Sequence, residues 1–268
     1  MTRILALLTS PLTAVSVLSA TACFTAQTGP AEIALLHPRP DMDPDYMPTE
    51  DVYTEAQRHA FETAEDEIST QLAQQAASWS QTGLPSLREE RGKVSAIALK
   101  AAASADIVVL GAPQGDMEAR TILGKLLCEA GKPVLLVPRA MPRSFGQTVA
   151  IGWHTGCAAA GRAIESVGNL LLAARQTVIL IGDEGQSSSA PPDNLVTRLD
   201  HAGKPAQVRH FPVQNRHIGE ALLHEARANG ADLLVMGAFS HGQLREFFFG
   251  GATSEVLKEL DLPVLMHH

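Results

Sequence analysis

One stretch of the sequence occurs twice, as Asp106-Ile107-Val108-Val109-Leu110-Gly111-Ala112-Pro113 and, 126 residues later, as Asp232-Leu233-Leu234-Val235-Met236-Gly237-Ala238-Phe239. In both copies an Asp precedes an uninterrupted apolar run, and a Gly ends it. Such runs are typical of strands covered on both faces, as in a parallel sheet between two layers of helices. The chain is therefore predicted to contain the same structural unit twice.

The repeat continues on both sides of this stretch. A helical segment and a last apolar run close each copy, and we expect the second of these helices to be one turn longer. Two apolar runs also open each copy. The matching segments are 133–137 with 263–267, 4–8 with 149–153, and 32–36 with 177–181.

These patterns predict an α/β fold of two tandem doubly wound domains, 1–140 and 147–268. Each domain is a five-stranded parallel sheet with helices on both faces, and a pseudo-twofold relates the two. The linker Arg139–Gln147 joins them. The strands are expected near 4–8, 32–37, 87–91, 106–111 and 133–137, and near 148–153, 177–182, 206–212, 232–237 and 263–267.

The last strand of each half is an apolar edge that would leave backbone groups unpaired. We therefore expect strands 133–137 and 263–267 to meet across the domain junction, so that the halves form an intramolecular pseudo-dimer. A helix is expected from about Glu50 to Ser80. The prolines before it, Pro38, Pro40, Pro44 and Pro48, indicate an exposed connection.

Composition excludes several classes of protein and partner. The chain has 21 Lys and Arg against 29 Asp and Glu, a net charge of -8, and no basic run that would neutralise a series of phosphates. We therefore expect no nucleic-acid partner. The three cysteines have no CxxC spacing, so neither a disulfide framework nor a zinc knuckle is predicted.

The uncharged N-terminal segment Ile4–Phe24 has features of an export signal, because Ala20-Thr21-Ala22 precedes Cys23 as at a lipoprotein cleavage site. However, Thr9-Ser10-Pro11 divides it into a strand-like and a helix-like part, both of which the repeat requires. We therefore predict that the segment is retained, that the protein is cytoplasmic and that it does not enter a membrane.

The stretch Gly237–Thr253 follows a predicted strand and contains widely spaced glycines. It resembles the universal stress protein family, whose nucleotide-binding members carry Gly, two residues, Gly, nine residues, Gly and then Ser or Thr. Gly237 and Gly250 match the first and third glycines, Ser240 stands at the second, and Gly251 replaces the hydroxyl residue. The resemblance covers nearly the whole chain as a tandem of two such domains.

The first half carries a more degenerate copy of the motif. Its positions are Gly111, Gln114, Gly124 and Lys125. In the family, the glycines let backbone N–H groups approach phosphate oxygens at a helix N-terminus. The alternative is that these residues only form a turn and a close helix contact, which we favour for the first half.

Nucleotide-binding members of the family also have an Asp after the first strand. Here Thr9 and His154 stand at that position in the two halves. The resemblance implies that any adenine nucleotide lies in the second half, with phosphates near Gly237, Ser240, Gly250 and Gly251 and the nucleoside near His154 and Asp183.

The function implied is a non-catalytic stress-response or signalling protein with a weak, altered or absent ATP site. The alternative is a slow ATP hydrolase that uses the same crevice. No metal site is predicted, because the ten histidines show no HxxxH or HExxH spacing.

Two further motifs are set aside. Ala238-Phe239-Ser240-His241-Gly242 is similar to a nucleophile elbow, but a suitable acid and His do not follow it. Gly124-Lys125 lacks the spaced glycine and the Ser or Thr of a P-loop.

Overall fold

The computed structural model describes residues 1–41, 54–79, 83–113, 115–183, 190–213, 217–238 and 251–268. The predictions made for Pro44, Pro48, Gln114, Ser240, His241 and Gly250 lie outside this part of the chain.

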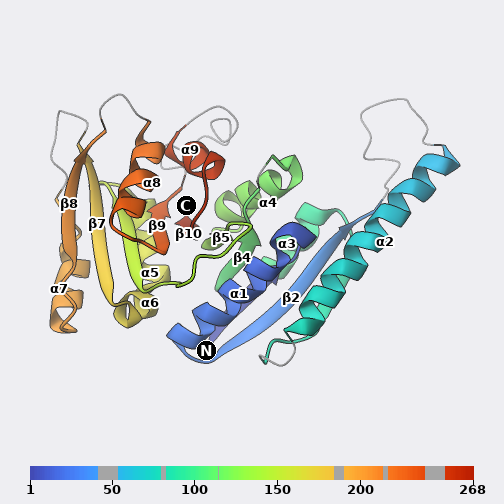
Figure 1. Ribbon diagram of the computed structural model, residues 1–268, viewed down its shortest axis with the longest axis horizontal. Helices are drawn as coiled ribbons and strands as arrows, with labels where there is room; N and C mark the ends of the chain where they lie inside the picture. Colours follow the sequence, from blue (N-terminus) through green and yellow to red (C-terminus); the bar gives the residue numbers. More distant parts are fainter. Residues whose placement is uncertain (42–53, 80–82, 114, 184–189, 214–216, 239–250) are drawn as a thin grey trace.

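The described strands form one ten-stranded sheet with the order β3-β2-β1-β4-β5-β10-β9-β6-β7-β8 (Figure 1). Strands within each half are parallel, and the predicted strand positions are confirmed to within a few residues. The first half contains β1 (Thr2–Leu7), β2 (Ala31–Pro40), β3 (Leu87–Gly92), β4 (Ile107–Gly111) and β5 (Val134–Val137). The second half contains β6 (Thr148–Trp153), β7 (Gln176–Asp183), β8 (Gln207–Pro212), β9 (Leu233–Gly237) and β10 (Val264–His267).

Helices cover both faces of the sheet, as the continuous apolar strands require. One apolar layer lies under α1 (Pro11–Thr28), α2 (Glu55–Ser78), α5 (Ala158–Ser166), α6 (Gly168–Ala173) and α7 (Asp193–His201). The other lies under α3 (Val94–Ala102), α4 (Met117–Cys128), α8 (Ile218–Ala228) and α9 (Ala252–Lys258).

The junction between the halves is the antiparallel pair β5–β10, as predicted. Leu135 lies opposite Leu265, and both are fully buried. The segment after β5 is also held against α1, because Ser16 Oγ donates to Arg139 O at 2.8 Å and Gln27 Nε2 donates to Phe145 O. Each apolar layer therefore continues across the junction.

The N-terminal segment forms the strand and the helix that the repeat requires. β1 pairs with β2 and β4, and Ala20 and Thr21 are fully buried in α1. No helix among the described residues is long and apolar enough to cross a membrane.

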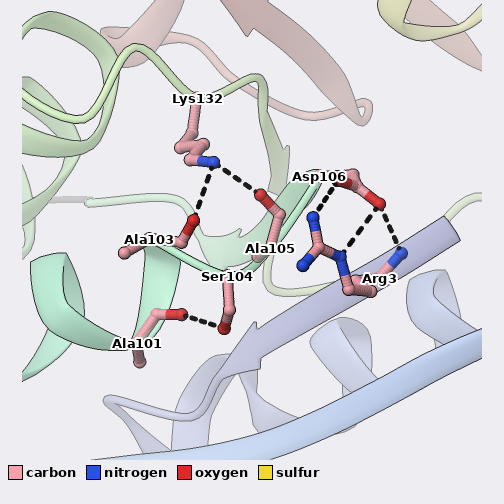
Figure 2. Close-up of polar contacts among 7 residues, drawn as sticks. All are labelled: Arg3, Ala101, Ala103, Ser104, Ala105, Asp106 and Lys132. Carbon is pink, nitrogen blue, oxygen red and sulfur yellow. Dashed lines mark hydrogen bonds and ion pairs between the residues drawn. The ribbon is translucent and has the colours of Figure 1, made fainter.

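The two copies of the repeated Asp have the same backbone role. Asp106 accepts hydrogen bonds from the Arg3 backbone N–H at 2.8 Å and from its guanidinium at 2.9 Å (Figure 2). Asp232 accepts from the backbone N–H groups of Gln147 and Thr148 at 3.2 and 3.1 Å. Each Asp thus fixes the start of the first strand in its half.

The interpretation of Pro38 and Pro40 as part of an exposed connection is wrong. Both lie in β2, and Pro38 is buried. The bond from Leu8 N–H to Leu36 O shows that every second residue of β2 directs its backbone groups toward β1. Pro38 and Pro40 share this direction at a point where β1 has ended, so their missing N–H groups interrupt little of the ladder.

Candidate functional site

The order of the strands reverses in the second half beside β6, which has β9 on one side and β7 on the other. In an open parallel sheet, the crevice at the carboxyl ends of the strands next to such a reversal is the usual ligand site. The β6–β9 register pairs Gly152 with Met236, which brings the segments that begin at His154 and Ala238 side by side. The residues predicted to bind nucleotide are gathered at this edge of the sheet.

The first glycine of each motif is required by helix packing. A Cβ on Gly237 would lie 2.6 Å from the backbone nitrogen of Ala160 in α5, and a Cβ on Gly111 would overlap the side chain of Thr13 in α1. Both strands therefore pass too close to a helix for any side chain at this position. For these two glycines, the interpretation as close helix packing accounts for the residue without a ligand.

The two halves differ in the connection that follows this glycine. Five residues, 112–116, lie between β4 and α4, whereas fourteen residues, 238–251, lie between β9 and α9. The prediction of a longer second helix is wrong, since α4 has 12 residues and α9 has 7. The additional residues of the second half precede its helix.

The shorter connection changes what the first-half motif means. Gly124 and Lys125 lie inside α4, well after its N-cap Asp116. Backbone N–H groups in a helix interior already donate to carbonyls four residues earlier, so these two residues offer none to a phosphate. The sequence match of Gly124 with Gly250 is therefore not a structural equivalence.

Gly251 occupies a backbone conformation that favours glycine. It is the N-cap of α9, with a φ of 89°, and it is exposed. The replacement of the family's hydroxyl residue by Gly251 thus coincides with a left-handed turn into the helix.

On the other side of the crevice, His154 is exposed in the turn after β6, and Asp183 is the last residue of β7. Asp183 is turned toward the edge strand, where its Oδ1 lies 3.4 Å from His210 Nδ1. The sequence gave no indication of His210, because the contact depends on the pairing of β7 with β8. No carboxylate of the described residues takes the place of the family's Asp after β6.

The segment before α7 is fastened to the end of β6. The Trp153 indole N–H donates to Ala190 O at 2.8 Å, and the Thr155 hydroxyl donates to the same oxygen at 3.2 Å. Trp153 also packs against the apolar layer under α5. Its ring therefore has a structural role at the rim of the crevice.

The end of β10 also reaches this edge, which sequence reasoning missed. His268 Nδ1 lies 3.0 Å from Ala238 O, and Arg162 Nε donates to His268 O at 2.6 Å. Ala238 N–H donates to His267 O at 2.8 Å. The parallel pairing of β9 with β10 is the signal that would have placed these residues beside the motif.

A buried carboxylate connects α9 with α8. Glu255 Oε2 accepts from Gly219 N–H at 2.8 Å, and Oε1 lies 3.2 Å from His217 Nδ1. A Cβ on Gly219 would overlap the backbone oxygen of Ala252, so the glycine allows the two helices to touch. Glu255 thereby caps the N-terminus of α8 and fixes the start of α9.

Metal chemistry finds no support in the described residues, which contain no group of three or more His, Cys, Asp or Glu side chains able to hold an ion. The three cysteines are free, and burial raises the pKa of the Cys128 thiol. None of the cysteines is thereby marked as a reactive thiolate.

Comparison with known proteins agrees with this geometry. The family model described as the universal stress protein family matches residues 158–268. The chain belongs to the universal stress protein family. The universal stress protein Slr1230 of Synechocystis is 25% identical over 173 residues, which are 60% of this chain and 57% of that protein. The chain therefore matches little more than half the length of this relative.

The fold of the whole chain is shared with solved structures of the family. A universal stress protein from Archaeoglobus fulgidus DSM 4304 has a TM-score of 0.71 and 15% identity, over 98% of this chain and 95% of that one. A putative universal stress protein from Pseudomonas aeruginosa UCBPP-PA14 has a TM-score of 0.53 and 12% identity, over 99% and 92%. At these identities the likeness describes the fold alone.

Proposed function

We propose that this universal stress protein is a non-catalytic stress-response or signalling protein that binds an adenine nucleotide, ATP in the first place, weakly and in its second half only. The observation that carries the proposal is the fourteen-residue connection 238–251 at the strand-order reversal, where the first half has only five residues. A connection of this length has room for a phosphate-binding loop.

The phosphates would be bound by backbone N–H groups of the motif. Ala238 N–H is not available, because it donates to His267 O. The groups near Ser240, Gly250 and Gly251 must therefore supply the hydrogen bonds. The exposed Gly251, which has no side chain to obstruct an anion, supports this assignment.

The nucleoside would lie toward β6 and β7, near His154 and Asp183. Neither residue reproduces the family's Asp after the first strand, and Asp183 is turned toward His210 on the edge strand. A hydrogen bond to a charged group contributes about 1.5 to 3 kcal/mol, so the missing carboxylate weakens binding by about one to two powers of ten. Weak affinity is therefore part of the proposal.

Calorimetry with ATP tests the site. We expect Ser240→Gly combined with His154→Asp to strengthen ATP binding about tenfold or more, since it restores two family positions. Gln114→Gly in the first half is the matched control and should leave affinity unchanged. Tight ATP binding by the unmodified protein, or a Gln114→Gly variant that gains a second site, would contradict the proposal.

Turnover separates the binding protein from a slow ATP hydrolase. Phosphate release should stay at the buffer rate after extensive purification, both in the unmodified protein and in the Ser240→Gly, His154→Asp variant. Release that rises with the restored affinity would identify the same crevice as a hydrolytic site.

We also propose that residues 1–140 and 147–268 are the two domains, that they pair as an intramolecular pseudo-dimer, and that the protein acts in the cytoplasm. The buried Ala20 and Thr21 support retention of the N-terminal segment, because cleavage before Cys23 would remove β1 and half of α1. Intact mass of the protein from its native host tests this. A lipid-modified species that begins at Cys23 would refute it.

A further inference from the structure

The first half carries a helix with unusually little apolar attachment. α2 has 24 residues, but Leu72 and Ala76 are its only buried residues. Residues 54–60 are all exposed, and the N-terminal end of the helix extends past the end of β2 (Figure 1). Burial of two small or medium apolar side chains holds only the later turns, so the outer turns must be held in another way.

A buried arginine makes this outer attachment. Arg39 near the end of β2 has a side chain only 6% exposed, and its guanidinium lies 2.7 Å from Asp66 of α2 and 3.5 Å from Glu89 of β3. Arg91 of β3 shares both carboxylates, at 4.0 Å from Asp66 and 3.5 Å from Glu89. The outer part of α2 is therefore tied to the sheet through a network of charges.

His37 lies next to this network and is 2% exposed. Its Nδ1 is 2.8 Å from Leu8 O. In a regular parallel ladder the backbone N–H of residue 38 would donate to this oxygen, but residue 38 is proline. The imidazole N–H replaces the missing backbone donor, which fixes the proton on Nδ1.

The other ring nitrogen is then a bare acceptor. Nε2 of His37 is buried and has no hydrogen-bond partner. The charged groups around the ring are Glu89, which lies opposite on β3, and Arg39 on β2. β1 presents only backbone here, and the carboxylates of α2, Glu65 and Asp66, face Arg39. The site as built accommodates only the neutral imidazole.

We propose that His37 makes the attachment of α2 sensitive to pH. When Nε2 takes a proton, it becomes a buried donor with a positive charge, and Glu89 is the nearest anion that can compensate it. Glu89 then leaves Arg39 and Arg91, and the charged tie between the sheet and the outer turns of α2 weakens. The helix loosens there, while Leu72 and Ala76 keep its inner turns in place.

The direction of the effect follows from the neutral state of the buried ring. Burial lowers the pKa of His37, although its bond to Leu8 partly opposes the shift. A lowered pKa in the folded state means that the stabilisation is complete above the ordinary histidine pKa of about 6.5 and is lost as pH falls further. The response therefore belongs to mildly acidic conditions.

Hydrogen exchange at pH 7.5 and 5.5, with labelling times scaled to the intrinsic exchange rate, tests the proposal. Peptides from residues 61–72 should lose up to about tenfold in protection relative to peptides from α8, the factor set by one pH unit below the ordinary pKa. His37→Asn keeps a donor for Leu8 O but cannot be protonated, so its response should disappear. His210→Asn, at an exposed histidine on β8, should respond like the unmodified protein.

Glu65 does not confuse this test. Burial raises the pKa of Glu65, so it also titrates in mild acid, but it is present in all three proteins. If His37→Asn fails to fold, the ring titration of His37 can be followed by NMR in the unmodified protein. Equal responses with and without His37, or a ring that titrates with no change in α2, would overturn the proposal.

Discussion

The two halves of the chain agree at the amino edge of the sheet and differ at its carboxyl edge. Asp106 and Asp232 hold the first strand of their halves in the same way, and Gly111 and Gly237 both lie against a helix. At the other edge, the first half has a short connection before a long helix, and the second half has a long connection before a short helix. The shared features stabilise the fold, and ligand binding is proposed only where the halves differ.

The same difference appears at the second strand. β2 extends to Pro40 and carries the buried Arg39 and the long α2, whereas β7 ends at Asp183 and is followed by the nine-residue α7. Each half has therefore used its carboxyl edge differently, one for a charged attachment of a helix and the other for an open crevice. The predictions below test whether this division is correct.

The largest effect is expected at the junction, because both halves depend on it. Leu135→Ala removes a fully buried side chain that faces Leu265 and should lower the free energy of unfolding by about 2 to 5 kcal/mol. Leu172→Ala, at a partly exposed position of α6, is the control and should cost much less. Urea unfolding followed by circular dichroism should show one transition. Two separate transitions would mean that the halves do not share a core.

The matched glycines are expected to show the next largest effect. Gly237→Ala and Gly111→Ala each place a methyl group against a helix and should destabilise the protein by about 1 to 3 kcal/mol, whether or not nucleotide is present. Gly161→Ala in α5 meets nothing within 4 Å and should instead stabilise the protein by about 0.5 to 1 kcal/mol. Thermal unfolding measures all three. A stable Gly237→Ala variant that only loses ATP binding would show that Gly237 serves the ligand.

The matched aspartates should differ in energy although they share a role. Asp232 is 5% exposed and satisfies two backbone N–H groups, so Asp232→Ala should cost about 1 to 3 kcal/mol. The side chain of Asp106 is 45% exposed, and water can replace it, so Asp106→Ala should cost clearly less. Chemical unfolding of the two variants decides this. Equal losses would mean that burial does not distinguish the two copies.

Much of this fold could be predicted because buried parallel strands are written as continuous apolar runs, and the repeat supplied each run twice. The pairing of β5 with β10 followed from the same apolar edges. Prolines were misinterpreted because sequence alone does not say toward which neighbour a strand directs its N–H groups. Once the end of β1 is known, Pro38 and Pro40 are ordinary residues of β2.

The candidate site was harder to predict, because its contacts join segments far apart in the sequence. The motif located Gly237 and Gly251, but it also aligned Gly251 with Lys125, which lies in the interior of a helix. His268 beside Ala238 and His210 beside Asp183 depend on strand pairing. Residues of this kind have no local pattern, so only the register of the sheet brings them to the site.

The smallest expected effect concerns Pro38, the position in β2 that corresponds in the repeat to Asp183 of β7. Pro38→Ala supplies the backbone N–H that Leu8 O lacks, so it competes with the bond from His37 Nδ1. The gain and the loss of one hydrogen bond nearly cancel, and the greater freedom of the unfolded chain costs about 0.4 to 1 kcal/mol. The single substitution should therefore change stability little in urea unfolding.

A double-mutant cycle makes this small change decisive. His37→Leu should cost less in the Pro38→Ala background than in the unmodified protein, because Leu8 O then keeps a donor without the imidazole. The expected coupling is about 1 kcal/mol, the usual net contribution of one hydrogen bond. Substitution of Gly182 in β7, the counterpart of His37, should show no coupling to Asp183. Additive losses for Pro38 and His37 would mean that the ring does not stand in for the proline's missing N–H, and the fixed neutral tautomer on which the pH response depends would fall with it.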